Sequence, residues 1–525
     1  MALAVLAISA GLSMNAATIY LSDASISVQA GGAEYTEGNL VNSVTTLTSD
    51  NLYILDKKIY VIDGQKLYIE PGTVIKATIG QGEAAPAIIV CRGGQIYAEG
   101  TKEKPIIFTT IEDPLDGSYA AINKEKWGGI IILGKAYNNV LYGDLNPEAE
   151  PEAQIGIANG ESYIEGLTYP DTRHHYGALT RNGVTGNPSG TPDFVNDDNS
   201  GVLRYVSIRH GGSEIGVANE INGLTLGSVG SKTTIEHVEV VSNGDDGIEF
   251  FGGTVNVKYI NIMYCEDDYI DTDQGYSGKG QFIFCVQLPA TEGDSVVSQG
   301  DNGFEWDGND FDGRTVLSTP MFTNVTIIGY AGVGAGATSS NADFGLELKE
   351  ECQGEVSNAI VAGFDWAGRH KNNDIYVTTT AVKDVLFLNC YSNGGFDNTY
   401  LTDCSFVTST SVIDDHLTIS TSLENGIWVQ NVVDPINAVP AAGTTEIETD
   451  YKPWEDDNFF SYAPYKGAFE PGTNPWTEGW TLHSKTGSDE GAADCPTDID
   501  GNGSTGLNDL IILGNNFGSS CPVNY

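Results

Sequence analysis

Paired carboxylates recur at a regular interval along the middle of the chain. A six-residue phrase reads DDGIEF at 245–250, DDYIDT at 267–272, DNGFEW at 301–306 and DFGLEL at 343–348. The first two copies start 22 residues apart and the last two start 42 apart, close to twice that interval. A period of this size is typical of one coil of a solenoid, which buries its apolar face by stacking on its neighbours. The acidic residues would then form a ladder along one edge of the stack.

Stacked carboxylates of this kind suit either cation binding or acid catalysis. Ca²⁺ prefers hard oxygen ligands. A glycoside hydrolase needs two carboxylates across the scissile bond, and a lyase needs calcium with an Arg or Lys base. Between residues 240 and 310 the basic residues are Lys258 and Lys279 alone, which favours a structural or calcium-binding role over catalysis. The candidate metal ligands are Asp245, Asp246, Asp267, Asp268 and Asp271.

A second group of oxygen ligands lies near the C-terminus, in the segment DIDGNGSTGLND at 498–509. Its spacing is that of a calcium loop of about 12 residues, with Gly503 at the sharp turn. The expected ligands are Asp498, Asp500, Asn502, Ser504 through its carbonyl oxygen, and Asp509. The loop resembles a dockerin repeat. Because one copy is present where a cellulosomal dockerin carries two, the resemblance implies a small calcium module and not cohesin pairing.

Short strands must position the acidic ladder. Seven six-residue segments alternate apolar and polar residues, many of them β-branched, which is the pattern of a strand with one buried face. They are residues 203–208, 235–240, 257–262, 322–327, 356–361, 382–387 and 401–406. With 64 glycines available for corners, these segments favour a parallel β-helix over a sandwich, in which no internal phrase would be expected to recur.

The remaining segments suggest how such a solenoid is completed at its ends. Residues 1–17 are apolar and fit a secretory signal peptide. A solenoid also has open ends that must be capped or joined to another copy. The expected organisation is a signal peptide at 1–17, an N-terminal cap or donated segment at 18–50, a parallel β-helix at 51–410, an aromatic-rich covering segment at 411–485 and a dockerin-like calcium module at 486–525.

Charge and cysteine content bound the partners and the compartment. With 71 acidic and 25 basic residues, the net charge of −46 opposes binding to nucleic acid or anionic membranes. We expect an extracellular protein with no membrane span in the mature chain. Eight cysteines without a C-x-x-C pair then favour disulfides over a metal cluster. The candidate pairs are Cys265–Cys285, Cys390–Cys404 and Cys495–Cys521.

Several phrases resemble a family of large secreted bacterial right-handed β-helix proteins. They are LYIEPGTVI at 67–75, WGGIIILG at 127–134, GIEFFGGTV at 247–255 and WTEGW at 476–480. The resemblance covers roughly residues 45–485 and implies a fold and a cell-surface location more firmly than an activity. The doublet Asp245-Asp246 is superficially similar to the aspartate pair of polygalacturonases. However, Arg209-His210-Gly211 precedes the doublet, whereas that family's His-Gly motif follows it.

Together these features predict a secreted or cell-surface structural or adhesive β-helix that is stabilised by Ca²⁺. We expect a structural role rather than an enzymatic one. The expected partners are further copies of the chain, joined end to end into extracellular fibres, and a surface polysaccharide. The alternatives are a polysaccharide lyase or glycoside hydrolase, or a non-catalytic carbohydrate binder, on the same scaffold.

Overall fold

The structure is a computed structural model, and it describes the β-helix with gaps. The residues described are 17–21, 38–40, 42–116, 119–120, 123–145, 156–165, 167, 171–178, 193–213, 221–287, 300–309, 314–329, 344–372, 377–390, 392–407, 439–440, 443–445 and 447–482, with the backbone alone at 421–424 and 427–430. The expected signal peptide and the calcium loop at 498–509 lie outside these residues. Within them, no helix is long and apolar enough to cross a membrane.

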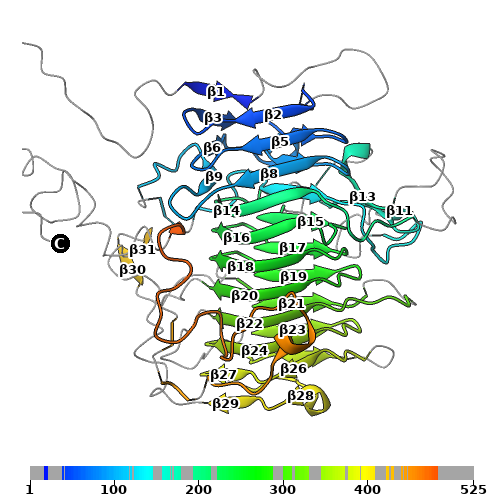
Figure 1. The fold of residues 1–525 in the computed structure, drawn as a ribbon, viewed down its shortest axis with the longest axis vertical. Coiled ribbons are helices and arrows are strands. Elements are labelled where there is room, and N and C mark those ends of the chain that lie inside the picture. Colours follow the sequence, from blue (N-terminus) through cyan, green and yellow to red (C-terminus); the bar gives the residue numbers. More distant parts are fainter. Residues whose placement is uncertain are drawn as a thin grey trace, which may run out of the picture.

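Parallel strands stack into a long solenoid, which confirms the predicted β-helix (Figure 1). Nine strands form one sheet, one strand to a rung. In order along the solenoid they are β4 (Ile59–Val61), β7 (Ile88–Val90), β10 (Ile130–Leu133), β15 (Leu224–Gly227), β17 (Ile248–Phe251), β19 (Ile270–Asp273), β21 (Phe304–Asp307), β23 (Leu346–Lys349) and β25 (Arg369–Lys371).

A second, seventeen-strand sheet completes the rungs. It begins with pairs of short strands: β1 (Thr18–Tyr20), β2 (Val44–Leu47), β3 (Leu52–Leu55), β5 (Lys66–Ile69), β6 (Val74–Ala77), β8 (Gln95–Glu99) and β9 (Ile106–Thr110). It continues with β14 (Gly201–Arg209), β16 (Thr234–Val241), β18 (Asn256–Met263), β20 (Lys279–Val286), β22 (Met321–Ile328) and β24 (Glu355–Ala362). It ends with β26 (Ala381–Lys383), β27 (Leu386–Leu388), β28 (Leu401–Thr402) and β29 (Ser405–Val407). At the N-terminal end, β1 pairs in parallel with β3 of the same chain.

Each long strand of this sheet bends at one residue in the left-handed conformation, with φ between 47° and 61°. Because of the bend, the inward-facing residues do not simply alternate but are separated by three positions and then by two. Leu203, Val206 and Ile208 follow this spacing and are all fully buried. The repeat segments are therefore bent strands and not the straight ones that their alternation predicted. The bending residues stack in one row: Tyr205, His237, Tyr259, Phe282, Asn324, Asn358, Asp384 and Asp403.

Positive φ is costly for aromatic residues but is tolerated by Asn and Asp. The aromatic part of the row compensates by ring stacking, because His237 lies 4.3 Å from Tyr205 and 4.4 Å from Tyr259 between ring centroids. Tyr259 in turn stacks on Phe282 at 4.8 Å.

One rung of the solenoid has no matching copy in the sequence repeat. Strand β20 lies between β18 and β22, where the repeat left a gap. Gly280 occupies the position that Val257 and Phe322 hold in the neighbouring rungs. A Cβ atom at Gly280 would come within 2.9 Å of the Phe322 ring, so the large ring fills the space that a side chain at Gly280 would take.

The inward faces of both sheets form one continuous core. In the nine-strand sheet, directly opposed aliphatic and aromatic residues make a ladder in which each contact repeats about every 4.8 Å. Its members are Ile59, Ile88, Ile130, Leu224, Ile248, Ile270, Phe304 and Leu346, all buried.

The C-terminal residues 439–482 run as a strap along the flank of the long sheet (orange in Figure 1). The strap contains one helical turn, α2 (Pro453–Asp456). Side chains at the strand bends hold the strap, since Asn324 Nδ2 donates to the Tyr465 carbonyl at 2.7 Å and Asn358 Nδ2 to the Tyr451 carbonyl at 3.1 Å. Trp480 is fully buried, so this aromatic residue packs on the flank and offers no face for sugar stacking.

Two of the predicted disulfides are wrong. The cysteines at 91, 265, 285, 352, 390 and 404 are free thiols. Cys285 is level with Ile262, three positions before Cys265, and Cys404 precedes Ser405, which pairs with Leu386. One coil of sequence separation therefore does not bring either pair into register, and a disulfide needs Cα atoms within about 7 Å. The third candidate pair, Cys495–Cys521, lies outside the described residues.

Candidate functional site

Seven carboxylates gather at one corner of the solenoid, where three rungs enter the nine-strand sheet. We call them the acidic corner: Asp245, Asp246, Glu249, Asp267, Asp268, Asp271 and Asp301. The aspartate doublets precede β17 and β19 by the same number of residues, and Ile248 pairs with Ile270. Phe304 and Leu346 continue that row, so all four copies of the acidic phrase are in register.

The second carboxylate of each doublet is oriented by the backbone of the next rung. Asp246 Oδ1 accepts the amide of Asp268 at 2.9 Å, and Asp268 Oδ1 accepts the amide of Asn302 at 2.6 Å. Asn302 Oδ1 repeats the contact with the amide of Phe344 at 3.0 Å. One oxygen of each buried aspartate thus caps a corner amide. The use of an amide at Asn302 shows that this capping needs an oxygen but no charge.

A second row of carboxylates projects from the strands themselves. Glu249, Asp271, Glu305 and Glu347 lie opposite one another on successive rungs, about 4.8 Å apart. Basic residues neutralise the downstream half of this row. Lys349 forms ion pairs with Glu305 and Asp307, the second at 3.2 Å. Glu347 pairs with Arg369 at 2.5 Å and with Lys371 at 3.4 Å.

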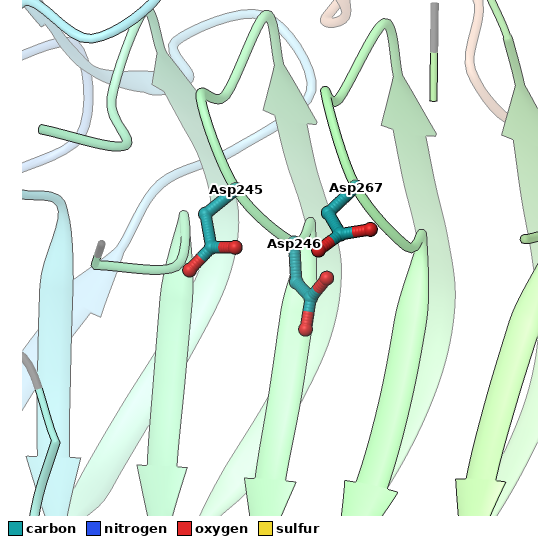
Figure 2. A group of neighbouring side chains, drawn as sticks. All are labelled: Asp245, Asp246 and Asp267. Atoms are coloured by element: carbon teal, nitrogen blue, oxygen red, sulfur yellow. The ribbon is translucent and has the colours of Figure 1, made fainter. Parts of the chain in front are cut away.

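Three overlapping sets of ligand atoms occur in the acidic corner. Within each set one carboxylate oxygen from every residue lies within 4.8 Å of the others. Figure 2 shows Asp245, Asp246 and Asp267, the first set, carried by the turns that lead into neighbouring strands. The other two sets are Asp246 with Glu249 and Asp271, and Asp267 with Asp268 and Asp301.

Burial and mutual repulsion make this corner electrostatically unfavourable by itself. Burial raises the pKa of Asp246 well above its usual value, and repulsion from Asp245 and Asp271 adds to the effect. Burial likewise raises the pKa of Glu249 and of Asp268, again with neighbouring carboxylates contributing. A bound divalent cation would relieve the repulsion, because it favours the ionised form of every carboxylate around it.

Two polar side chains that the sequence did not single out adjoin the corner. Asn222 is 1% exposed; its Nδ2 donates to Glu249, and its Oδ1 has no hydrogen-bond partner among the described residues. Thr225 lies directly opposite Glu249 on the preceding rung. The triplet Asn222-Gly223-Leu224 matches Asn302-Gly303-Phe304, which is the sequence signal that points to this earlier rung.

The corner therefore offers Ca²⁺ the hard oxygen ligands it requires, from carboxylates. All five ligands predicted from the middle of the sequence are brought together here, and Glu249 and Asp301 join them. Arg209 and His210, the basic residues considered for a hydrolase, contact residues outside the corner. Arg209 lies 3.8 Å from Glu239, and His210 Nδ1 lies 2.7 Å from the Asn123 carbonyl oxygen.

Residues 38–161 and 183–431 match the family described as the pectate-lyase-like β-helix domain. The chain belongs to this family. The matched residues include the whole acidic corner. Among solved structures, pectate lyase Pel9A is 14% identical over 78% of this chain and 89% of its own, with a TM-score of 0.37. A search of curated proteins gave no match.

Proposed function

We propose that this protein is a secreted, calcium-dependent carbohydrate-binding β-helix that attaches to acidic polysaccharide at or beyond the cell surface. The observation that carries the proposal is the gathering of seven carboxylates, in three overlapping sets, at one corner. Ca²⁺ takes about six to eight oxygen ligands. Coordination positions that the corner leaves open can be filled by the carboxylates of a uronate polymer, so calcium would bridge two anionic partners. Membership of the pectate-lyase-like family supports a carbohydrate as that partner.

Binding fits the basic residues that pair with the downstream carboxylates better than cleavage does. A lyase needs a base that is neutral enough to remove a proton next to the sugar carboxylate. Burial of Lys349 favours the neutral amine, but the carboxylates of Asp307 and Glu305 outweigh burial and raise its pKa above the usual value. Lys349 therefore stays protonated. Arg369 and Lys371 are paired with Glu347 and serve charge balance in the same way.

Cleavage of the same polymer by a calcium-assisted lyase is the second candidate, and family membership is the observation that favours it. Calcium would neutralise the sugar carboxylate and so acidify the adjacent carbon. A chain residue would still have to take the proton. Lys349 is held protonated by its ion pairs, whereas burial lowers the pKa of Lys124, which interacts with Glu266 beside Asp267.

The two candidates are separated by one experiment on the full-length protein. It is incubated with polygalacturonate or with a neutral glucan, in calcium or in chelator, while bound protein and unsaturated products are both measured. We expect retention on polygalacturonate in calcium, release by chelator and no unsaturated product. Retention that ignores calcium would contradict the proposal, and calcium-dependent appearance of unsaturated ends would establish the lyase instead.

End-to-end assembly into fibres remains a prediction. The last strands of the seventeen-strand sheet in chain order, β28 and β29, pair with β26 and β27 on one side. Electron microscopy of the purified protein, with and without a chelator, would show calcium-dependent filaments if assembly occurs and dispersed monomers if it does not.

A further inference from the structure

A polar cavity of about 430 Å³ opens beside the first rungs of the nine-strand sheet. Strand β4, η1 (Gly82–Ala84) and η2 (Thr172–His174) contribute its walls. Its lining residues are Asp56, Lys57, Lys58, Tyr60, Glu83, Ala84 and Arg173. Three cations in one cavity are unusual for a chain with 25 basic residues against 71 acidic ones.

The back wall of this cavity is rigidly built. The Arg173 guanidinium lies 3.6 Å from the centre of the Tyr60 ring. Asp171 accepts from Arg173 Nε at 3.0 Å and from Nη2 at 2.6 Å, and Asn39 Oδ1 accepts from Nη1 at 2.7 Å. The Tyr60 hydroxyl is itself paired with His174 Nε2 at 2.9 Å. The arginine is therefore held in place without a ligand, which lowers the entropic cost of binding one.

The two lysines form the adaptable side of the cavity. Lys58 Nζ donates to the backbone carbonyl of Glu83, while burial lowers the pKa of Lys58 against the raising effect of the Glu83 carboxylate. Lys57 makes no ion pair with any described residue. An anionic ligand would stabilise both ammonium groups. Partial burial removes part of their hydration, and charge-assisted hydrogen bonds to the ligand would replace it.

The cavity lies on the same edge of the solenoid as the acidic corner. Lys57 precedes Ile59, the first residue of β4, by two positions, as Asp246 precedes Ile248, the first residue of β17. Ile59 and Ile248 are joined by four consecutive strand pairings. Four rungs correspond to about 19 Å along the solenoid axis. A cationic and an anionic site thus share one edge, at a distance that a short stretch of polymer can span.

We propose that this cavity is a calcium-independent subsite that binds a carboxylate of the polysaccharide directly through Lys57 and Lys58, with Asp56 and Glu83 accepting from its hydroxyl groups. The subsite rests on the proposed function, since it takes a second uronate of the same chain. Calcium bridges like charges at the acidic corner, whereas here the opposite charges pair without it.

The test compares the full-length protein with the double variant Lys57→Gln/Lys58→Gln. A matched control, Lys232→Gln/Lys452→Gln, removes the same charge from two exposed lysines whose side chains are 64% and 50% accessible. Each protein is titrated with oligogalacturonate and with a neutral oligoglucan, in calcium and in chelator, and circular dichroism checks the fold. We expect the double variant to bind oligogalacturonate roughly tenfold more weakly in calcium, the order of one charge-assisted hydrogen bond.

In chelator, the wild-type protein should keep a weak, salt-sensitive binding to oligogalacturonate that the double variant lacks and the control retains. Equal binding by all three proteins in both conditions would overturn the subsite while leaving the calcium site intact. Equal binding of the neutral oligoglucan in chelator would overturn the carboxylate as its ligand. If wild-type protein bound oligogalacturonate in neither condition, the proposed function itself would fail.

Discussion

Replacing Asp246 by asparagine should have opposite effects on stability with and without calcium. The asparagine keeps a carbonyl oxygen for the amide of Asp268, a contact of 2.9 Å, and removes the charge. The rung two positions further along already uses this solution, because Asn302 caps Phe344 in the same way at 3.0 Å. The substitution therefore separates the electrostatic role of the carboxylate from its structural role.

The magnitude follows from the spacing of the corner. Two ionised carboxylates whose oxygens lie within 4.8 Å of each other repel by about 3 kcal/mol or more at an effective dielectric constant of ~20. Partial protonation of the buried acid, whose pKa is raised by burial, reduces that value. We expect the variant to be about 1–3 kcal/mol more stable than wild type in chelator. In calcium at about 100 times its dissociation constant, the ion adds ~2.7 kcal/mol to the wild type, much of which the variant loses.

The assay is urea unfolding followed by tryptophan fluorescence, in chelator and in calcium. Asp63→Asn serves as the control, because its side chain is 81% exposed and should change stability by less than about 0.5 kcal/mol in both conditions. Destabilisation of Asp246→Asn by the same amount in both conditions would refute the reasoning. The carboxylate would then act only as a cap that asparagine replaces poorly.

Three further predictions concern pH, the strap and the thiols. Because burial raises the folded-state pKa values of Asp246, Glu249 and Asp268, their contribution to stability in chelator is greatest at low pH and is lost as pH rises through those values. In chelator, the urea concentration at the unfolding midpoint should therefore rise for wild type relative to Asp246→Asn as pH falls from 7 to 5. Calcium binding should weaken over the same pH range. A difference between the two midpoints that does not change with pH would contradict this. Glu239→Ala should cost about 3–5 kcal/mol, since it leaves buried Arg209 without its carboxylate and releases the amide of Leu482. The control Glu236→Ala, at a partly exposed ion pair, should cost at most about 1 kcal/mol, and equal losses in urea unfolding would refute the prediction. Alkylation should leave Cys265 and Cys285 unmodified in the native protein, because burial raises the pKa of Cys265 to about 12, and should modify both in urea without reductant; a disulfide-linked peptide in the mass spectrum would show that they are paired.

The sequence revealed the solenoid because its physics is local and periodic. Apolar residues at matching places in successive rungs, such as Ile248 and Ile270, must recur for a rung to stack, so the repeat is visible without any contact information. The acidic phrase was visible for the same reason. Its acidic residues were expected to form a ladder along one edge of the stack, and the strand register places the four copies in one row.

Features that depend on a single rung or on distant segments were not predictable in this way. The Gly280 rung escaped notice because Phe322, from the next rung, supplies the missing side-chain volume. The disulfide predictions relied on sequence spacing, while pairing depends on register along the strand. The wall of the polar cavity joins Arg173 to Asn39, which are 134 residues apart, so no local pattern indicates it.

The most direct test of a calcium site at the acidic corner is a crystal structure of the full-length protein grown in Ca²⁺, with anomalous data collected to locate the ion. The account predicts an anomalous peak among Asp245, Asp246 and Asp267, with carboxylate oxygens at about 2.3–2.6 Å. A corner without an anomalous peak at saturating calcium, with its carboxylates held only by backbone amides, would contradict it.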